Sequence, residues 1–360
     1  MRFSNFRHQV ISVLMLPLAA LYSLGMSLRL FAYRVKILKS YRFDIPTISI
    51  GNMSVGGAGK TPHVEYLVRL LSPYLHTGIL SRGYGRKTSG YLEAQAHHSA
   101  TDIGDESKQY VRKFPEVMVA VGEQRAFAIP RMIGDRPKLQ TILLDDAFQH
   151  QAVKPSLNIL LTESTRLFTQ DYLLPFGRLR EWRSSYKRAD VIIVTKCRDT
   201  FSDEDAQNAT KDMQLRPHQS IFFSRYKYGV PYHFSDTNWT MPLTKDASIL
   251  LVCGIANTDY LTEHLAEYSD DVRMIAFGDH HYFDKFDIGR IHGIFDDLPT
   301  DRPKIILTTE KDATRLDLHH EYIAEHQLPI FVLPIEVAFL WDAKDTFDQY
   351  IKQHLLGFKA

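Results

Sequence analysis

Short apolar runs separated by polar segments recur along most of this chain of 360 residues. In its first part they lie at residues 47–50, 77–80, 117–121, 141–146, 157–162 and 191–195. Most are continuous rather than alternating in polarity, which is typical of parallel strands covered on both faces. The segment after the first run instead places Val64, Leu67 and Val68 at helical spacing. The pattern predicts an α/β fold with a doubly wound, mostly parallel sheet.

A second series of apolar runs follows an aromatic, irregular stretch that begins near residue 225. These runs lie at residues 248–255, 272–278, 304–310 and 330–335. They predict a second, smaller α/β domain. We expect a larger α/β domain over residues 41–230 and the smaller one over 231–360, with a site in the cleft between them.

Residues 1–40 differ from both series, since an uncharged apolar run covers residues 10–28. On a helix, Leu21, Leu24 and Leu28 share a face, and Ser23 and Ser27 lie on another. Residues 1–43 also carry seven basic side chains and no acidic one, whereas the net charge of the chain is only +1. This pattern predicts a helix that lies in a membrane interface, with its basic residues on anionic headgroups.

Two alternatives remain for this N-terminal segment. It could pack as a helix against the core of the protein, or it could span the bilayer, for which its nineteen uncharged residues are marginal. A span would still leave the body cytoplasmic, because more basic residues follow the run than precede it. We therefore expect a peripheral or monotopic protein on the cytoplasmic side, and no nucleic-acid partner. The two distant cysteines, Cys197 and Cys253, also fit a reducing compartment.

The stretch "SVGGAGKTP", residues 54–62, follows the first predicted strand and opens the first predicted helix. This is the context of a phosphate-binding loop, although the general template has glycine where this chain has Ser54. The backbone of the loop would cradle phosphates, Lys60 would reach the β- and γ-phosphates, and Thr61 would bind Mg²⁺. The loop residues predicted to bind the nucleotide are Ser54, Val55, Gly56, Gly57, Ala58, Gly59, Lys60 and Thr61.

A phosphate loop needs an acidic partner for Mg²⁺ at the end of another strand. The stretch "TILLDDAFQH" supplies Asp145 and Asp146 after four apolar residues. Either aspartate could be the direct ligand. The bound nucleotide is expected to be ATP, because neither "VTKCRD" nor "TEKD" has the N/T-K-x-D spacing of guanine-specific proteins.

Further polar motifs follow predicted strands or open predicted helices. In "GDES", Asp105 could cap a helix or act as a general base on a hydroxyl. In "FGDHHYF", a histidine could orient such a carboxylate. "SRGYGR" and "LLPFGRLREW" are candidate loops for anionic ligands. In "TTEKDATRL", a helix start alone would explain Glu310 and Asp312.

Taken in order, these motifs resemble the tetraacyldisaccharide 4′-kinase (lipid A 4′-kinase) family. The resemblance rests on the basic apolar N-terminus and on "GNMSVGGAGKTP", "LSRGYGR", "GDES", "VGEQR", "DDAFQH", "LREW", "VTK", "GDHHYF" and "TEKDA". The family also has Ser or Thr at the position of Ser54. Ala147 departs from its usual pattern, in which glycine is common.

The resemblance implies transfer of the γ-phosphoryl group of ATP, with Mg²⁺, to the 4′-hydroxyl of an acylated glucosamine disaccharide 1-phosphate at the inner membrane. It implies that Asp105 is the catalytic base, paired with His280. It further implies supporting roles for Glu106, Arg125, Gln149, Arg180 and Glu181. Two α/β/α domains are also expected from it.

Two other functions compete with this one. A membrane-associated regulatory NTPase would use the same loop and aspartates but no sugar acceptor. A non-catalytic protein that binds anionic lipids would not need Lys60.

Overall fold

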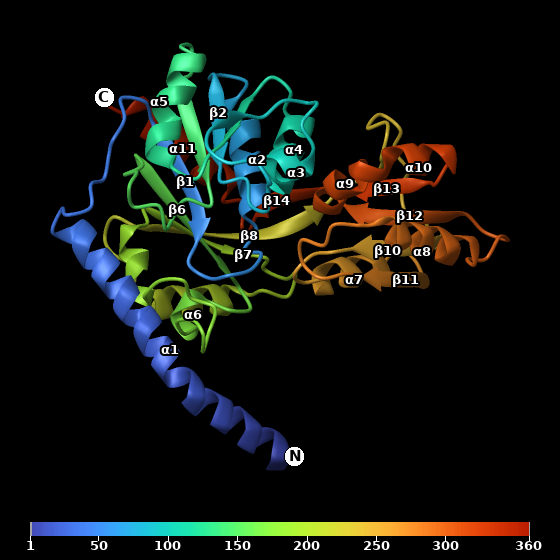
Figure 1. Cartoon of the computed structure of the whole chain (residues 1–360), viewed down its shortest axis with the longest axis horizontal. Helices are drawn as coiled ribbons and strands as arrows, with labels where there is room; N and C mark the ends of the chain where they lie inside the picture. Colours follow the sequence, from blue (N-terminus) through green and yellow to red (C-terminus); the bar gives the residue numbers. More distant parts are fainter. Residues whose placement is uncertain (1, 360) are drawn as a thin grey trace. The chain divides into compact units, whose positions relative to one another are not determined.

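The computed structural model describes residues 2–359, with side chains described from Pro17 onward. Figure 1 labels its elements. The α-helices are α1 Arg2–Arg34, α2 Lys60–Leu71, α3 Ala100–Ile103, α4 Asp105–Lys113, α5 Arg125–Asp135, α6 Asp203–Met213, α7 Asp259–Ala266, α8 Lys285–Asp296, α9 Glu310–Leu316, α10 His320–Glu325 and α11 Lys344–Leu356. The strands are β1 Thr47–Asn52, β2 Thr77–Ser81, β3 Leu92–Glu93, β4 Met118–Val121, β5 Thr141–Asp145, β6 Leu157–Glu163, β7 Val191–Thr195, β8 Ser220–Tyr228, β9 Tyr232–His233, β10 Ser248–Cys253, β11 Asp271–Ala276, β12 Lys304–Thr309, β13 Ile330–Leu333 and β14 Ile335–Phe339. Short 3₁₀ turns lie at Phe168–Gln170, Arg183–Arg188 and Asp317–His319.

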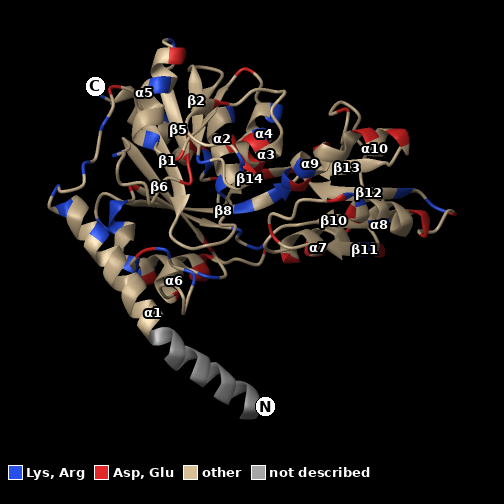
Figure 2. Cartoon of the chain, viewed as in Figure 1, with Lys and Arg blue, Asp and Glu red and all other residues tan. Residues whose placement is uncertain are grey.

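Helix α1 covers most of the predicted N-terminal segment and leaves apolar side chains in solvent. Five large apolar residues are 55–66% exposed at spacings of three or four: Leu18, Leu21, Leu24, Leu28 and Phe31. Lysine and arginine gather at the C-terminal end of α1 and just beyond it (Figure 2). The alternative in which this apolar face of α1 packs against the protein core is therefore wrong. Among the described residues, no helix is long and apolar enough to cross a membrane. The predictions for the apolar and basic side chains before Pro17 concern residues whose side chains are outside the described part.

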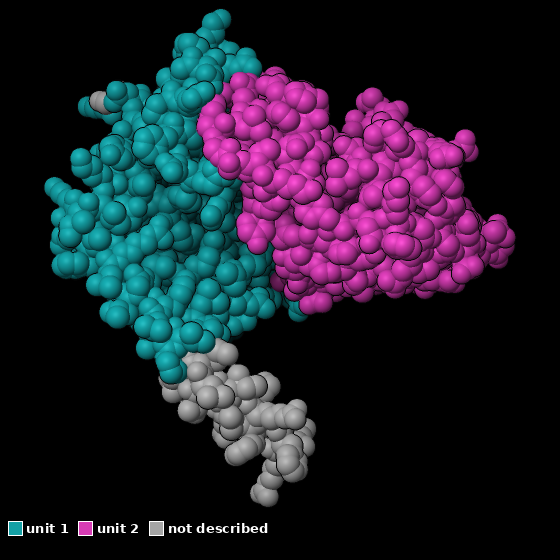
Figure 3. Space-filling model, in the orientation of Figure 1, with its two compact units in different colours: residues 1–82, 122–226, 337–360 teal, residues 83–121, 227–336 magenta. Residues whose placement is uncertain are grey.

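The chain divides into two compact units, drawn in different colours in Figure 3. Unit 1 comprises residues 1–82, 122–226 and 337–360, and unit 2 comprises residues 83–121 and 227–336. The division of the chain into two domains at residue 230 stays a prediction. The compact units differ from it because residues 83–121 join unit 2 and residues 337–360 join unit 1.

Unit 1 is built on parallel strands in the order β8-β7-β6-β1-β5-β2, with β14 beside β8. Every residue of β1, β2, β5 and β7 is buried, as the continuous apolar runs predicted. In this register Ile50 of β1 lies beside Asp145 of β5. The carboxyl ends of these strands therefore bring the glycine loop after β1 next to the aspartates after β5.

Unit 2 contains a sheet in the order β11-β10-β12-β13-β9, parallel except for β9. Its strands separate two apolar cores, because successive side chains point to opposite faces. Leu250 and Val252 pack in one core with α8 and α10, whereas Ile249 and Leu251 pack in the other with α7. The predicted α/β/α layering of the second domain is thus present in this unit.

The sequence pattern missed some strands in the region described as irregular. β8 extends to Tyr228, and β9 follows within the same aromatic stretch. β8 was missed because only Phe222, Phe223 and Ser224 are buried, so its pattern is neither a continuous apolar run nor a clean alternation.

Candidate active site

The glycine loop runs from the end of β1 to the start of α2, as a phosphate loop requires. Gly56 and Gly59 have φ values of 111° and 84°, which only glycine adopts without strain. Ser54 is not among the positive-φ residues; it forms an antiparallel bridge with Leu179. The loop therefore needs glycine at Gly56 and Gly59 but accepts a side chain at Ser54.

One backbone group and two side chains of neighbouring segments bind the backbone of this loop. The Val55 amide donates to the Arg178 carbonyl at 2.8 Å, and the Thr195 hydroxyl donates to the Ala58 carbonyl at 3.0 Å. His63 Nδ1 donates to the Gly59 carbonyl at 2.7 Å. These contacts hold the shape of the loop, which leads into the N-terminus of α2, a position where anions bind readily.

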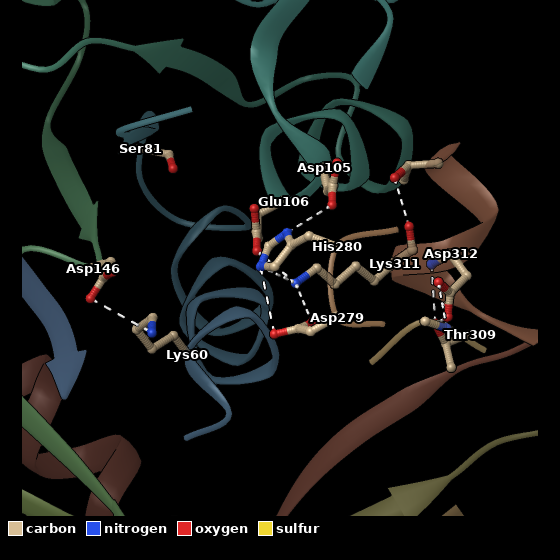
Figure 4. Close-up of polar contacts among 12 residues, drawn as sticks. Lys60, Ser81, Asp105, Glu106, Asp146, Asp279, His280, Thr309, Lys311 and Asp312 are labelled. Atoms are coloured by element: carbon tan, nitrogen blue, oxygen red, sulfur yellow. Dashed lines mark hydrogen bonds and ion pairs between the residues drawn. The ribbon is translucent and has the colours of Figure 1, made fainter. Parts of the chain in front are cut away.

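The ammonium group of Lys60 lies among oxygen atoms from two other strand ends. It donates to Asn52 Oδ1 at 3.2 Å and is 3.6 Å from Asp146 Oδ1 (Figure 4). Arg180 joins the same cluster, since its guanidinium contacts Asp146 Oδ1 at 3.0 Å and Asn52 Oδ1 at 2.7 Å. Desolvation alone would raise the pKa of Asp146, but Lys60 and Arg180 outweigh it and hold the pKa at about 2. Asp146 is therefore an ionised carboxylate throughout the physiological range.

Asp145 lies at the end of β5, next to Asp146, and its side chain is buried. Ser81 donates to Asp145 Oδ2 at 3.3 Å. The donor atoms predicted for Mg²⁺, on Thr61, Asp145 and Asp146, are all oxygens, and Mg²⁺ is usually held by one or two carboxylates with phosphates and water. Among the described residues, no group of three or more His, Cys, Asp or Glu could hold a metal ion. The predicted donor set is therefore of the chemical kind that Mg²⁺ prefers.

Two further predicted supporting residues, Arg125 and Gln149, lie in unit 1 beside this cluster. Arg125 is buried, and its guanidinium donates to the backbone carbonyls of Gly122 at 2.6 Å and Asp145 at 3.1 Å. Burial lowers the pKa of Arg125 to about 10, so it stays cationic at neutral pH. The Gln149 amide donates to the Asn52 carbonyl at 2.7 Å. Arg125 and Gln149 therefore fix the backbone at the ends of β5 and β1.

Glu181 follows Arg180 in the sequence, but its side chain contacts a different residue from those of this cluster. It is fully buried, and its Oε2 accepts from Arg188 at 2.7 Å. Its neighbour Arg180 makes the contacts to Asp146 and Asn52 described above. A role for Glu181 near Mg²⁺ stays a prediction.

In unit 2, the turn after β11 brings His280 to the start of α4. His280 Nδ1 lies 3.2 Å from Asp105 Oδ2. Asp105 is 1% exposed and is the first residue of α4; the N-cap is Gly104, so the capping interpretation of Asp105 is wrong. Burial and the neighbouring Asp105 carboxylate raise the pKa of Tyr282 to about 12, so its hydroxyl keeps its proton and donates to Asp105 Oδ1 at 3.3 Å. The carboxylate thus has a donor on each oxygen.

The remaining predicted residue of this unit, Glu106, is linked to His280 through a lysine. Lys311 Nζ lies 3.2 Å from Glu106 Oε1 and 3.0 Å from His280 Nε2 (Figure 4). The Tyr84 ring of the "SRGYGR" loop packs against the His280 ring at 4.9 Å between centroids. This loop therefore contacts the histidine in this structure.

Sequence reasoning missed several residues that hold these two clusters. In unit 1 they are Asn52 and His63, and in unit 2 they are Arg315 and Lys311. Asn52 lies between the predicted strand at residues 47–50 and the glycine loop, and this position was a usable signal. The others are internal to helices, where sequence alone does not reveal a buried polar contact.

Comparison with known proteins gives one consistent result. The family model described as tetraacyldisaccharide-1-P 4′-kinase matches residues 11–356. A protein from Bacteroides thetaiotaomicron named tetraacyldisaccharide 4′-kinase is 42% identical over 354 residues, covering 95% of this chain and 92% of that protein. One of the same name from Parabacteroides distasonis is 41% identical over 348 residues, covering 95% and 94%. The crystal structure of the "apo" form of LpxK from Aquifex aeolicus in complex with ATP is similar with a TM-score of 0.72 and 25% identity, covering 96% of this chain and 99% of that one.

Proposed function

Because the chain belongs to the tetraacyldisaccharide-1-phosphate 4′-kinase family, we propose that it transfers the γ-phosphoryl group of ATP to the 4′-hydroxyl of an acylated glucosamine disaccharide 1-phosphate, a step of lipid A biosynthesis. The observation that carries this proposal is the Asp105–His280 pair. A buried carboxylate with a histidine partner is suited to take a proton from a hydroxyl group. An NTPase that needs only water and a partner protein has no evident use for it.

The residues of unit 1 would bind the nucleotide. The amide groups of Gly56 to Gly59 cradle its phosphates, and Lys60 contacts the β- and γ-phosphates. Thr61, Asp145 and Asp146 would hold a Mg²⁺ ion, which would supply charge to neutralise the phosphate oxygens. Asp146 and Asn52 contact the Lys60 ammonium group at 3.6 Å and 3.2 Å, and these contacts position the lysine at the loop. Arg180 supplies a second cation beside Asp146.

The residues of unit 2 would prepare the acceptor. Asp105 accepts the proton as the O–H bond of the 4′-hydroxyl breaks, and the freed oxygen attacks the γ-phosphorus while ADP leaves. His280 and Tyr282 hold the carboxylate through one hydrogen bond each. Positioning of this kind is the main contribution a protein makes to phosphoryl transfer.

The acceptor carries acyl chains, so the site must work at a membrane surface. We propose that the exposed apolar face of α1 lies in the cytoplasmic interface of the inner membrane, with Arg29, Arg34 and Lys36 near anionic headgroups. The opposite side of α1 is held by unit 1: the Tyr22 hydroxyl donates to the Arg180 carbonyl at 2.8 Å, and Trp182 donates to Ser27 at 3.0 Å. The membrane helix is thus tied to the segment that carries Arg180.

The test is a transfer assay with the purified chain, γ-labelled ATP, Mg²⁺ and the glycolipid acceptor in mixed micelles. The wild-type chain should label the acceptor, and Asp105→Asn should lower the rate by roughly 10²–10⁴-fold, the usual contribution of a general base. ATP binding by Asp105→Asn should be unchanged, which serves as the control for folding. Acceptor-independent ATP hydrolysis, with no labelled lipid from the wild type, would instead support the regulatory NTPase. Lipid binding without nucleotide binding would support the non-catalytic alternative.

A further inference from the structure

A pocket of about 580 Å³ in unit 1 has no role in the chemistry described above. It lies between the 3₁₀ turn Arg183–Arg188, the end of α6 and the segment that follows α6. The turn leads into the amino end of β7 and the segment leads into the amino end of β8, whereas the glycine loop follows the carboxyl end of β1. The pocket is therefore built from elements that do not carry the predicted nucleotide-binding residues.

Hydrogen bonds and a pair of stacked rings hold the walls of this pocket together. The Tyr186 hydroxyl of the turn donates to the Gln214 carbonyl at 2.9 Å. From the segment after α6, Gln219 Nε2 donates to the Tyr186 and Ala189 carbonyls at 2.9 Å and 2.8 Å. The rings of Tyr186 and Phe168 stack with 5.5 Å between their centroids. The pocket is therefore preformed, and a ligand does not have to order its walls on binding.

Basic side chains outnumber acidic ones in the lining of the pocket. Arg183, Lys187 and Arg216 are basic, and Asp212 is the one carboxylate among the lining residues that the structure describes. Asp212 Oδ2 accepts from Gln170 Nε2 at 3.1 Å. Within the described part of the chain, the side chains of Lys187 and Arg216 have neither a hydrogen bond nor an ion pair. Unpaired cations gathered at one pocket favour an anionic ligand.

The buried residues of the lining are apolar. Phe168 and Met213 belong to a hydrophobic core of unit 1, and Leu215 packs against that core. The three basic residues are instead exposed. A rim of cations over an apolar floor suits a ligand that is anionic at one end and apolar at the other.

The pocket borders the segment that holds α1. Trp182 directly precedes Arg183, and its indole N–H donates to Ser27 of α1 at 3.0 Å. Arg183 Nε donates to the Asp171 carbonyl at 2.7 Å, and its guanidinium lies over the Tyr172 ring, 4.9 Å from the centroid. Trp182 and Tyr172 are 40% and 66% exposed, and exposed Trp and Tyr are typical of a membrane–water interface. With α1 at the bilayer, a membrane lipid is therefore the amphiphile nearest to this pocket.

We propose that this pocket binds the headgroup of an anionic phospholipid. Arg183, Lys187 and Arg216 contact the phosphate, and the first methylene groups of the acyl chains lie against Phe168 and Met213. The volume of the pocket is within the range of roughly 300–1,000 Å³ that is usual for ligand sites, which holds a headgroup but not full-length acyl chains. This inference deepens the proposed function and rests on it for the place of α1 at the membrane.

The chemistry that the pocket recognises is a phosphate ester, which soluble phosphates such as glycerol 3-phosphate also offer. The apolar floor of Phe168 and Met213 favours the lipid, because a soluble phosphate leaves this floor in contact with water. A bound lipid also gives unit 1 a second contact with the membrane besides α1. Two contacts fix the orientation of unit 1, whereas a single helix in the interface can still roll about its own axis.

The experiment measures the binding of short-chain lipids below their micelle concentration, by calorimetry on the full chain without ATP or acceptor. The wild type should bind dihexanoyl-phosphatidylglycerol. Dihexanoyl-phosphatidylcholine should bind more weakly by roughly 10-fold or more, because its choline cation faces the basic rim. Glycerol 3-phosphate should also bind more weakly by roughly 10-fold or more, because it has no acyl chains to cover the apolar floor.

Substitutions of the two unpaired cations test the location of the site. Lys187→Gln combined with Arg216→Gln should weaken the binding of dihexanoyl-phosphatidylglycerol by roughly 10- to 100-fold, because two charge-assisted contacts are lost. The variant should fold as the wild type does, since neither side chain binds another described residue, and circular dichroism checks this. The matched control is Lys138→Gln combined with Lys211→Gln, which removes two charges from exposed residues of unit 1 that do not line the pocket. That control should bind the lipid as the wild type does.

Each outcome decides one part of the proposal. Equal binding of the two phospholipids overturns recognition of an anionic headgroup, and equal binding of glycerol 3-phosphate overturns the lipid in favour of a soluble phosphate ester. Unchanged binding by the double variant of the pocket overturns the location, as does loss of binding in Leu24→Glu combined with Leu28→Glu, which changes only α1. If the double variant fails to fold, Lys187→Gln and Arg216→Gln are compared singly with the wild type.

These outcomes are distinct from those of the transfer assay, because no nucleotide or acceptor is present. A wild type that binds dihexanoyl-phosphatidylglycerol but labels no acceptor overturns the proposed kinase function and leaves the lipid site standing. A wild type that labels the acceptor but does not bind the short-chain lipid overturns the lipid site alone.

Discussion

Gly104 shows how a single backbone position supports the residue that follows it. Its φ of 86° is one that residues with a side chain adopt only with strain. A Cβ atom there would lie 2.9 Å from the Tyr84 carbonyl oxygen and 3.0 Å from Gly83. Glycine at this position therefore allows the loop of Tyr84 to pack directly against the start of α4, where Asp105 lies.

We predict that Gly104→Ala destabilises the protein by about 1–3 kcal/mol and lowers kcat, because both the φ value and the close approach must change. Urea unfolding and the transfer assay measure the two effects. The matched control is Gly289→Ala in α8, where a Cβ meets nothing within 4 Å. That variant should be up to about 1 kcal/mol more stable, since alanine favours a helix over glycine. Equal effects of the two substitutions would contradict this account.

His63 gives a second prediction at the scale of the residue, through pH. It is buried, its Nδ1 donates to the Gly59 carbonyl, and its Nε2 accepts from the Ser224 hydroxyl at 3.1 Å. Burial lowers its pKa from 6.5 to about 4. Between these values the unfolded chain binds a proton that the folded chain does not, so stability is lost as the pH falls from 6.5 toward 4.

The comparison is between the wild type and His63→Asn in urea unfolding at pH 7 and pH 5. The wild type should lose on the order of 2 kcal/mol more than the variant over this interval, since one pKa unit corresponds to about 1.4 kcal/mol. Parallel losses in the two proteins would show that His63 does not titrate as its burial requires.

At the scale of the element, α1 has two faces with different partners. Tyr22 and Ser27 bind the segment that contains Arg180 and Trp182. Leu21, Leu24 and Leu28 face away and are exposed. A helix that only stabilised the fold would bury its largest apolar side chains, so the exposed face requires another partner.

We predict that Leu24→Glu combined with Leu28→Glu weakens binding to vesicles of phosphatidylethanolamine and phosphatidylglycerol by about 10- to 100-fold, because two apolar side chains are lost and two negative charges are added. Sedimentation with the vesicles measures the binding. Phe127→Glu, which changes an exposed apolar residue on α5, is the control and should bind as the wild type does. Transfer to an acceptor dispersed in detergent should be retained in all three proteins. Undiminished vesicle binding by the double variant would exclude the α1 face as the membrane contact.

At the scale of the whole molecule, the sequence predicted the strands whose environment is uniform. β1, β5 and β7 are buried on both faces, so their local composition is sufficient to identify them. It did not predict β14, which is short and only partly buried. Nor did it predict that residues 83–121 and 337–360 join units far from them in sequence, because local periodicity carries no information on such long-range packing.

The residues of the candidate site also fall into those that the sequence identifies and those that it does not. Residues within recognisable motifs, such as Lys60 and Asp146, could be named from the sequence, and the structure brings these two within 3.6 Å. Arg315 could not, since it contributes through a contact with Asp105, which is distant in the chain. The catalytic roles of Asp105 and His280 stay predictions, although their side chains meet.

The interleaving of the two units also orders events during protein synthesis. Asp105 leaves the ribosome 175 residues before His280, a delay of roughly 10–35 s at ordinary elongation rates. At the end of that interval α4 and β10 have been made, but β12 and β13, which pair in the sheet of β10, have not. The synthesis of unit 1 is completed later still, because α11 belongs to this unit and follows all of unit 2 in the sequence. A nascent chain therefore makes the glycine loop early, but it can complete the sheet and helices of unit 1 only after unit 2 has been made.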